Sequence, residues 1–173
     1  MRRYRCNMKL SRYLTEQVIK LEMETVIEPP AEGVSLKRWH EEGKRMIINE
    51  LVTLLENGAR IGNRTKLITD FVNREKKATT GIGHGVAVPH IRSLQAKDLM
   101  MAFARSTNGY DFDALDHEPT HLFFAMAAPP YDDNLYLKIF KALSQMLQDK
   151  SFRDELMRVS SPGEVIRAIK SRE

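Results

Sequence analysis

The chain has a single cysteine, Cys6, among its 173 residues. One cysteine excludes an internal disulfide and a cysteine-rich zinc site. Cys6 falls within residues 1–8, which we expect to be a flexible N-terminal segment where the thiol has no role. The five histidines show no spacing typical of metal ligands, so the sequence predicts no metal site and no bound cofactor.

Long hydrophobic runs are also missing. No run approaches the ~20 apolar residues needed to cross a bilayer. The basic start at residues 1–5 is not followed by the apolar stretch of a signal peptide. These absences predict a cytoplasmic protein that does not insert into a membrane.

Blocks of one charge sign are absent as well. The net charge is +4, yet Lys and Arg are interleaved with Asp and Glu, as in Lys37-Arg38 followed by Glu41-Glu42. No interleaving of basic and aromatic residues and no helix-turn-helix pattern stands out. This distribution is typical of a solvated surface, so we do not predict nucleic-acid binding.

Helical and extended patterns alternate along the chain, which predicts one α/β domain over residues 9–173. Apolar residues at helical spacing predict helices at residues 9–20, 41–56, 63–76, 135–147 and 151–159 and from 162 onward. Period-two or continuous apolar stretches predict strands at residues 86–88, 99–105 and 121–128, with an edge strand beginning at 21–24. Asn63 and residues 132–134 are expected helix caps, and Asn108-Gly109 an expected turn.

The most informative pattern that is present runs from residue 79 to 90, Thr-Thr-Gly-Ile-Gly-His-Gly-Val-Ala-Val-Pro-His. Pro89 restricts Val88 to extended geometry, and the glycines allow tight turns. The pattern therefore places the His90 imidazole at the carboxyl end of a strand, where open α/β sheets form their sites. An imidazole has an ordinary pKa of ~6.5, so it is largely neutral near neutral pH and can act as a nucleophile.

Two familiar kinds of catalytic loop do not accompany this histidine. The chain has no Walker-type phosphate loop, so ATP is not the expected phosphoryl donor. It has no nucleophile elbow either, which argues against serine-hydrolase chemistry.

Residues 75–90, with Ile82-Gly83, Val86-Ala87-Val88 and Pro89-His90, resemble the active-site signature of the fructose/mannitol-type IIA components of the bacterial sugar phosphotransferase system. Nitrogen-regulatory IIA proteins share that signature, and the likeness runs from about Leu10 to the C-terminus. It implies a three-layer sandwich, a mixed sheet with helices on both faces. It also implies that His90 is phosphorylated by the histidine-containing phosphocarrier protein and, in the sugar branch, passes the phosphoryl group to a cysteine of a IIB domain.

A regulatory role is the alternative within the same family. A stand-alone IIA chain with no fused IIB or membrane domain fits the nitrogen-regulatory branch at least as well as the sugar branch. Its phosphorylation state would then control a partner kinase or transporter. A IIA protein that no longer transfers efficiently is a third possibility, because the chain departs from the family pattern.

The departures lie at three places. Ile91 stands where the family usually has a small residue after the active histidine. Tyr136 stands at about the place of the family's second histidine, after the Ala127–Pro130 loop. Residues near 28–40 look like part of an insertion.

Several side chains are candidates for supporting a phosphoryl group on His90. A family arginine falls at the place of Arg74, whose guanidinium offers a fork of donors suited to phosphate. Arg92 and the hydroxyl of Thr80 are weaker candidates, and Tyr136 can donate one hydrogen bond. His84, in the glycine loop, could replace the missing second histidine or be a solvated loop residue. The remaining histidines fit structural or surface roles: His121 in a buried strand, His40 and His117 on the surface.

Overall fold

The computed structural model describes residues 9–131 and 133–173. The predictions for residues 1–8, Cys6 included, and the cap expected at Asp132 lie outside the described residues. Among the described residues, no helix is long and apolar enough to cross a membrane.

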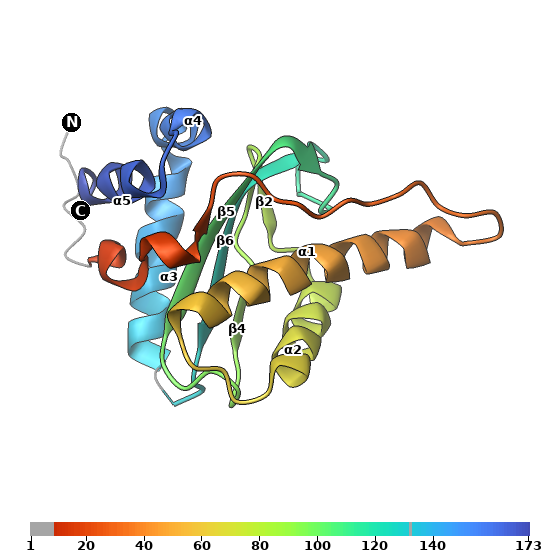
Figure 1. Ribbon diagram of the computed structural model, residues 1–173, viewed down its shortest axis with the longest axis horizontal. Helices are drawn as coiled ribbons and strands as arrows, with labels where there is room; N and C mark the ends of the chain where they lie inside the picture. The colour runs from red at the N-terminus through yellow and green to blue at the C-terminus, as the bar shows by residue number, and fades with distance from the viewer. Residues whose placement is uncertain (1–8, 132) are drawn as a thin grey trace.

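A mixed six-stranded sheet forms the middle layer of the molecule (Figure 1). The strand order is β1-β5-β6-β3-β2, and β4 pairs with β6 outside this path. β5 runs antiparallel to β6, while β3 and β4 pair in succession, both parallel, with β6. β1 is parallel to β5 at one edge, and β2 is antiparallel to β3 at the other. The strands are β1 Ile19–Lys20, β2 Gly81–Gly83, β3 Val86–Ala87, β4 His90–Arg92, β5 Met100–Tyr110 and β6 Thr120–Ala128.

Helices cover both faces of this sheet. In Figure 1, α1 (Leu36–Gly58) and α2 (Arg64–Lys77) lie on one side, and α3 (Asp133–Gln148), α4 (Lys150–Arg158) and α5 (Pro162–Lys170) on the other. Two short 3₁₀ helices, η1 (Leu10–Tyr13) and η2 (Glu16–Val18), lead into β1. The predicted three-layer α/β sandwich is confirmed.

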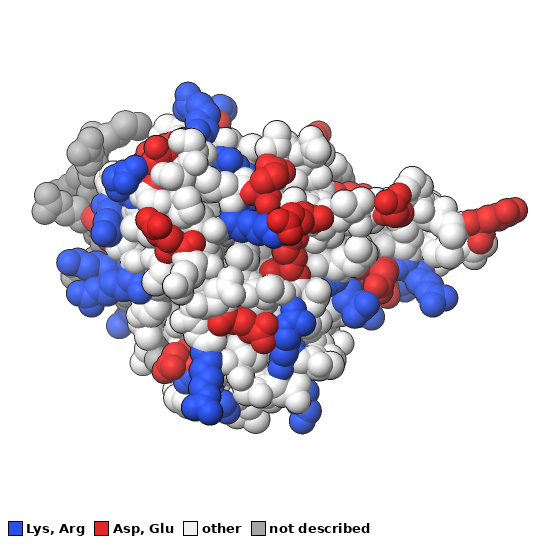
Figure 2. Space-filling model, viewed as in Figure 1, with Lys and Arg blue, Asp and Glu red and all other residues white. Residues whose placement is uncertain are grey.

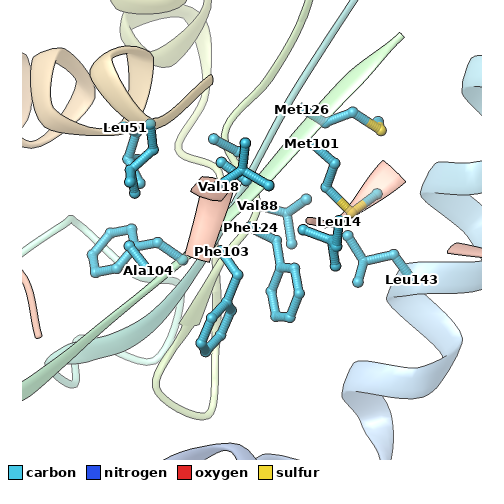
Figure 3. Packing of buried hydrophobic residues seen from close by; sticks show 14 of the residues in the cluster. Leu14, Val18, Leu51, Val88, Met101, Phe103, Ala104, Phe124, Met126 and Leu143 are labelled. Carbon is cyan, nitrogen blue, oxygen red and sulfur yellow. The ribbon is translucent and has the colours of Figure 1, made fainter. Parts of the chain in front are cut away.

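The hydrophobic core explains why β6 has a nearly continuous apolar sequence. Phe123, Phe124 and Met126 are fully buried, since helices cover both sides of the strand. Figure 3 shows Phe124 beside Phe103 of β5, with ring centroids 4.9 Å apart. Leu51 from α1 and Leu143 from α3 approach this cluster from opposite sides, so the two helical layers are joined through the sheet (Figure 3).

The N-terminal prediction was wrong. Residues 9–20 form η1, η2 and β1 instead of one amphipathic helix, because the extended backbone of Thr15 separates the two turns. Ile19 then pairs with Phe103, which places β1 two residues before the edge strand expected at 21–24. β-branched residues such as Val18 and Ile19 favour this extended pairing over helix.

Other boundaries also differ from the sequence prediction. α1 begins at Leu36, ahead of the expected residue 41, because the Ser35 side chain caps it by accepting from the Arg38 N–H. β2 and β4 were not predicted as strands: β2 lies in the glycine-rich stretch before Val86, and β4 begins at His90. The turn expected at Asn108-Gly109 is an irregularity within β5, where Gly109 has a φ of +74°.

Residues 24–35 form an arm that runs out beyond the sheet and returns as α1 (Figure 1). The base of the arm is held by Glu50, whose carboxylate accepts hydrogen bonds from the backbone N–H groups of Glu24 and Thr25. Further out, Trp39 Nε1 donates to the Glu28 carbonyl at 2.7 Å. The insertion expected near residues 28–40 covers the outer part of this arm and the first turn of α1, and its status as an insertion stays a prediction.

Candidate active site

His90 is fixed in register at the start of β4. It pairs with Met126 of β6, and the Met126 N–H donates to the Pro89 carbonyl at 2.8 Å. Val88 and Pro89 are buried, so the chain leading to His90 is held on both sides. Ile91 points to the opposite face of the strand and packs against the core, whereas His90 and Arg92 share a face.

The hydrogen bonds of the imidazole define its tautomer. Nδ1 lies 2.6 Å from the Val88 carbonyl oxygen, and Nε2 lies 3.3 Å from Nη2 of Arg74. A carbonyl oxygen can only accept and a guanidinium can only donate, so Nδ1 carries the proton and Nε2 presents its lone pair. This is the arrangement of a nucleophilic Nε2.

Arg74 is held beside His90 by the end of α2. Its Nη1 donates to the Ala78 carbonyl at 2.9 Å, in the segment that follows the helix. This bond orients the guanidinium so that Nη2 faces the imidazole. A charged, oriented fork lies where oxygens of a group on Nε2 would need a partner.

Two aromatic residues of α3 form a wall beside the imidazole. The ring centroid of Phe140 lies 4.6 Å from that of His90, and the centroid of Tyr136 lies 6.3 Å away. Four residues apart on a helix, the two side chains share one face. Sequence reasoning missed Phe140. The only signal was its spacing from Tyr136, which also fits an ordinary core-facing residue.

Burial and charge set the protonation of the site. Burial of the ring, with a further effect of the Arg74 charge, holds the pKa of His90 below its ordinary 6.5, against the opposing effect of the Val88 carbonyl. Burial likewise raises the pKa of the Tyr136 phenol above its usual 10.0. Both groups are therefore neutral at neutral pH.

Arg92 brings a second positive charge to this face of β4. Its guanidinium carbon lies 5.8 Å from the ring centroid of Tyr136. A cation over an aromatic face is attracted by the ring quadrupole, which helps to hold the side chain there. Arg74 and Arg92 thus approach the site from α2 and from β4.

The structure does not bring His84 to this site. His84 lies in the turn between β2 and β3, and its backbone N–H donates to Asp116 Oδ2 at 2.7 Å. β3 then runs away from this turn toward His90, and Val86 pairs with Leu122, whereas His90 pairs with Met126. Four extended residues span roughly 13 Å, so His84 lies beyond the opposite end of this stretch.

Thr80 is close in sequence to the site but its polar groups are already used. Its hydroxyl and its N–H both donate to the buried carboxylate of Glu75. It therefore contacts α2, and its hydroxyl is not aimed at His90.

Two of the other histidines have structural contacts, and His117 is exposed. His121 Nδ1 bonds to the Ser106 carbonyl at 3.0 Å, and His40 Nδ1 lies 3.4 Å from Asp111. Within the described ranges, no group of three or more His, Cys, Asp or Glu residues could hold a metal ion.

A family model described as "Phosphoenolpyruvate-dependent sugar phosphotransferase system, EIIA 2" matches residues 31–172, most of the chain. The chain belongs to this EIIA family. Its IIA fold thus matches the resemblance carried by the signature at residues 75–90.

Relatives of this IIA chain come from both branches of the family. The fructose-specific EIIA component of Haloferax volcanii is 32% identical over 144 residues, covering 83% of this chain and 86% of that protein. The fructose-specific EIIABC component of Bacillus subtilis is 31% identical over 159 residues, 92% of this chain but 22% of that protein's length. The nitrogen regulatory protein IIA-Ntr of Neisseria meningitidis superposes with a TM-score of 0.76 at 28% identity, covering 92% of this chain and 98% of that one.

Proposed function

We propose that this IIA protein is a phosphoryl carrier in which Nε2 of His90 accepts a phosphoryl group from the histidine-containing phosphocarrier protein and passes it to a IIB domain. The observation that carries the proposal is the pair of contacts on the imidazole. The Val88 carbonyl accepts a hydrogen bond from Nδ1–H, which leaves the Nε2 lone pair facing Arg74. Membership of the EIIA family supports the same chemistry.

The transfer step follows from this tautomer. The Nε2 lone pair forms a new N–P bond while the N–P bond of the donor phosphohistidine breaks and its electron pair returns to the donor nitrogen. The Nδ1 proton stays on His90, so the ring becomes an imidazolium whose positive charge is stabilised by the Val88 carbonyl. Arg74 then binds phosphoryl oxygens, with Arg92 as a second cation, so that the step is driven by positioning and charge stabilisation.

Intact-mass measurement tests the acceptor. The protein is incubated with phosphoenolpyruvate, enzyme I and the histidine-containing phosphocarrier protein, and we expect one acid-labile, base-stable phosphoryl group. His90→Ala should abolish this increase in mass. His84→Ala is the matched control, because it removes an imidazole from the same stretch of chain, and it should still be phosphorylated. Phosphorylation of the His90→Ala protein would refute the assignment.

Arg74→Lys tests the guanidinium at the same site. Lysine keeps the positive charge but loses the fork that can bind two oxygens at once. We therefore expect slower phosphorylation of His90 with an unchanged melting temperature. Equal rates for the variant and the parent would show that the arginine geometry is not used.

A regulatory role is the second candidate, and the likeness to the Neisseria IIA-Ntr structure over 98% of that chain favours it. In that role the phosphorylation state of His90 would control a partner protein such as a kinase or transporter. Chasing labelled phospho-His90 with purified IIB domains separates the two. Rapid loss of label to a IIB cysteine supports the sugar branch, and retention of label with every IIB domain tried supports the regulatory branch.

A further inference from the structure

Glu75 is a buried carboxylate that the proposed transfer step does not use. It is 6% exposed and follows Arg74 directly on α2. Both oxygens accept from the Thr80 N–H, at 3.0 and 3.2 Å, and one also accepts from the Thr80 hydroxyl at 2.6 Å. A buried carboxylate is costly unless its hydrogen bonds and charge are satisfied, so this arrangement needs an explanation.

Lys44 of α1 supplies the opposite charge. Its Nζ lies 3.4 Å from Glu75 Oε1 and 2.8 Å from the Asp113 carboxylate, and its side chain is 12% exposed. The Glu75 carboxylate is therefore held from two directions, by Lys44 on one side and by Thr80 on the other.

Thr80 connects this carboxylate to the imidazole. Its carbonyl accepts from the Val88 N–H at 3.0 Å, and the Val88 carbonyl is the group that binds Nδ1 of His90. A displacement of Thr80 would therefore move Val88 and weaken the bond that fixes the tautomer. The two adjacent residues of α2 act on opposite sides of one ring, with Arg74 at Nε2 and Glu75, through Thr80 and Val88, at Nδ1.

We infer that Glu75 is a positioning residue for His90, acting through Thr80 and Val88, and that Lys44 holds its carboxylate in place. The catalytic relevance of this inference rests on the proposed function, since it matters only if Nε2 of His90 reacts. The positioning of the imidazole itself does not depend on the proposed function, because the hydrogen bond from Nδ1–H to the Val88 carbonyl is present in the unphosphorylated protein. The charge of Glu75 also opposes that of Arg74 at the imidazole, and this keeps the pKa of His90 from falling further.

Nitrogen-15 NMR of the unphosphorylated protein is the direct test, since it reports which ring nitrogen of His90 carries the proton. In the parent we expect one tautomer, protonated at Nδ1. Glu75→Gln loses the charge held by Lys44 and should give a mixture of the two tautomers. Glu41→Gln is the control, because Glu41 also joins α1 to α2, through Lys76 at 3.5 Å, but on the exposed surface. The control should keep the parental spectrum.

Substitutions at Thr80 keep the test decisive if Glu75→Gln fails to fold. Thr80→Val keeps the shape but removes the hydroxyl, and should shift the tautomer in the same direction. Thr80→Ser restores the hydroxyl and should restore the Nδ1 tautomer. If Thr80 served only to stabilise the fold, these substitutions would change the melting temperature, but the tautomer of His90 would not depend on the presence of the hydroxyl.

Phosphorylation rates then connect the geometry to transfer. If the function is as proposed, the variants that lose the tautomer should be phosphorylated up to about a hundredfold more slowly, the cost of a misplaced reacting group. A parental spectrum in both Glu75→Gln and Thr80→Val would overturn the inference about Glu75. Absence of phosphorylation on His90 in the parent would instead overturn the proposed function while leaving the tautomer result standing.

Discussion

The ring of His90 is contacted by residues from three separate parts of the chain. Val88, directly after β3, binds Nδ1, Arg74 faces Nε2 from α2, and Phe140 packs on the ring from α3. The sequence predicted Arg74 and Tyr136 near His90, and the structure places them there. Phe140 could not be singled out, because a residue four positions after Tyr136 in an amphipathic helix reads as core.

The lowered pKa of His90 predicts how acceptance of a phosphoryl group depends on pH. The reactive form is the neutral ring, so the rate should be flat at higher pH and fall as the pH drops through the pKa of His90. That fall should come below the ordinary imidazole value of 6.5, chiefly because the ring is buried. An NMR titration of the His90 ring nitrogens measures the midpoint directly.

Arg74→Gln is the matched variant for this titration. Removing the guanidinium charge should raise the midpoint toward 6.5, since Arg74 disfavours the charged ring. A parental midpoint at or above 6.5 would contradict the contribution of burial.

Tyr136→His tests the departure from the family pattern that the sequence predicts at this position. Tyr136 is a buried neutral phenol, and a protonated imidazole in its place would add a charge-assisted bond to a phosphoryl group on His90. We expect phospho-His90 to form faster or to hydrolyse more slowly. Tyr136→Phe, which removes only the hydroxyl, should change little if Arg74 is the main partner. Unchanged rates in the histidine variant would show that Tyr136 does not face the phosphoryl group.

At the scale of elements, the well-patterned segments could be predicted and the short ones could not. α2 begins after Asn63 as expected, and the continuous apolar run over residues 121–128 identified the central strand. β1, β2, β3 and β4 have only two or three residues each, too few to show a period. They exist because neighbouring strands supply hydrogen bonds, as the pairing of β3 and β4 with β6 illustrates.

The N-cap of α2 gives a prediction about stability. Asn63 Oδ1 accepts from the Lys66 N–H at 2.9 Å, so Asn63→Ala leaves that donor without its partner. We expect a loss of about 1 kcal/mol in the free energy of unfolding, measured by urea denaturation. Lys66→Ala, an exposed change in the same turn that keeps the cap, should have a much smaller effect. Similar losses in both variants would mean that the cap contributes little.

At the scale of the whole molecule, the first and last described segments meet. The Ser11 N–H and hydroxyl both donate to the Glu173 carboxylate, at 2.7 and 3.0 Å. The surface charges, by contrast, are spread out: on the face in Figure 2, described Lys and Arg residues are interspersed with Asp and Glu.

Because Ser11 and Glu173 are in contact, we expect the chain to tolerate circular permutation. Joining residue 173 to residue 9 through a short Gly/Ser linker and opening the chain between Pro30 and Ala31, in the exposed arm, should leave the sheet intact. Circular dichroism and phosphorylation of His90 measure the outcome. A permutant opened between Ala125 and Met126, which are both fully buried in β6, should fail to fold. Failure of the arm permutant would show that the arm is needed as a continuous chain.

The contact between Ser11 and Glu173 also has a consequence for a domain fused to either end of this chain. A domain fused before residue 9 or after residue 173 would leave the surface from nearly one place, and Figure 1 shows the C-terminal end well away from β4, where His90 lies. A linker at either end must therefore span a similar path to bring a fused acceptor to the imidazole. Its length, more than the choice of end, would determine the effective concentration of that acceptor at His90.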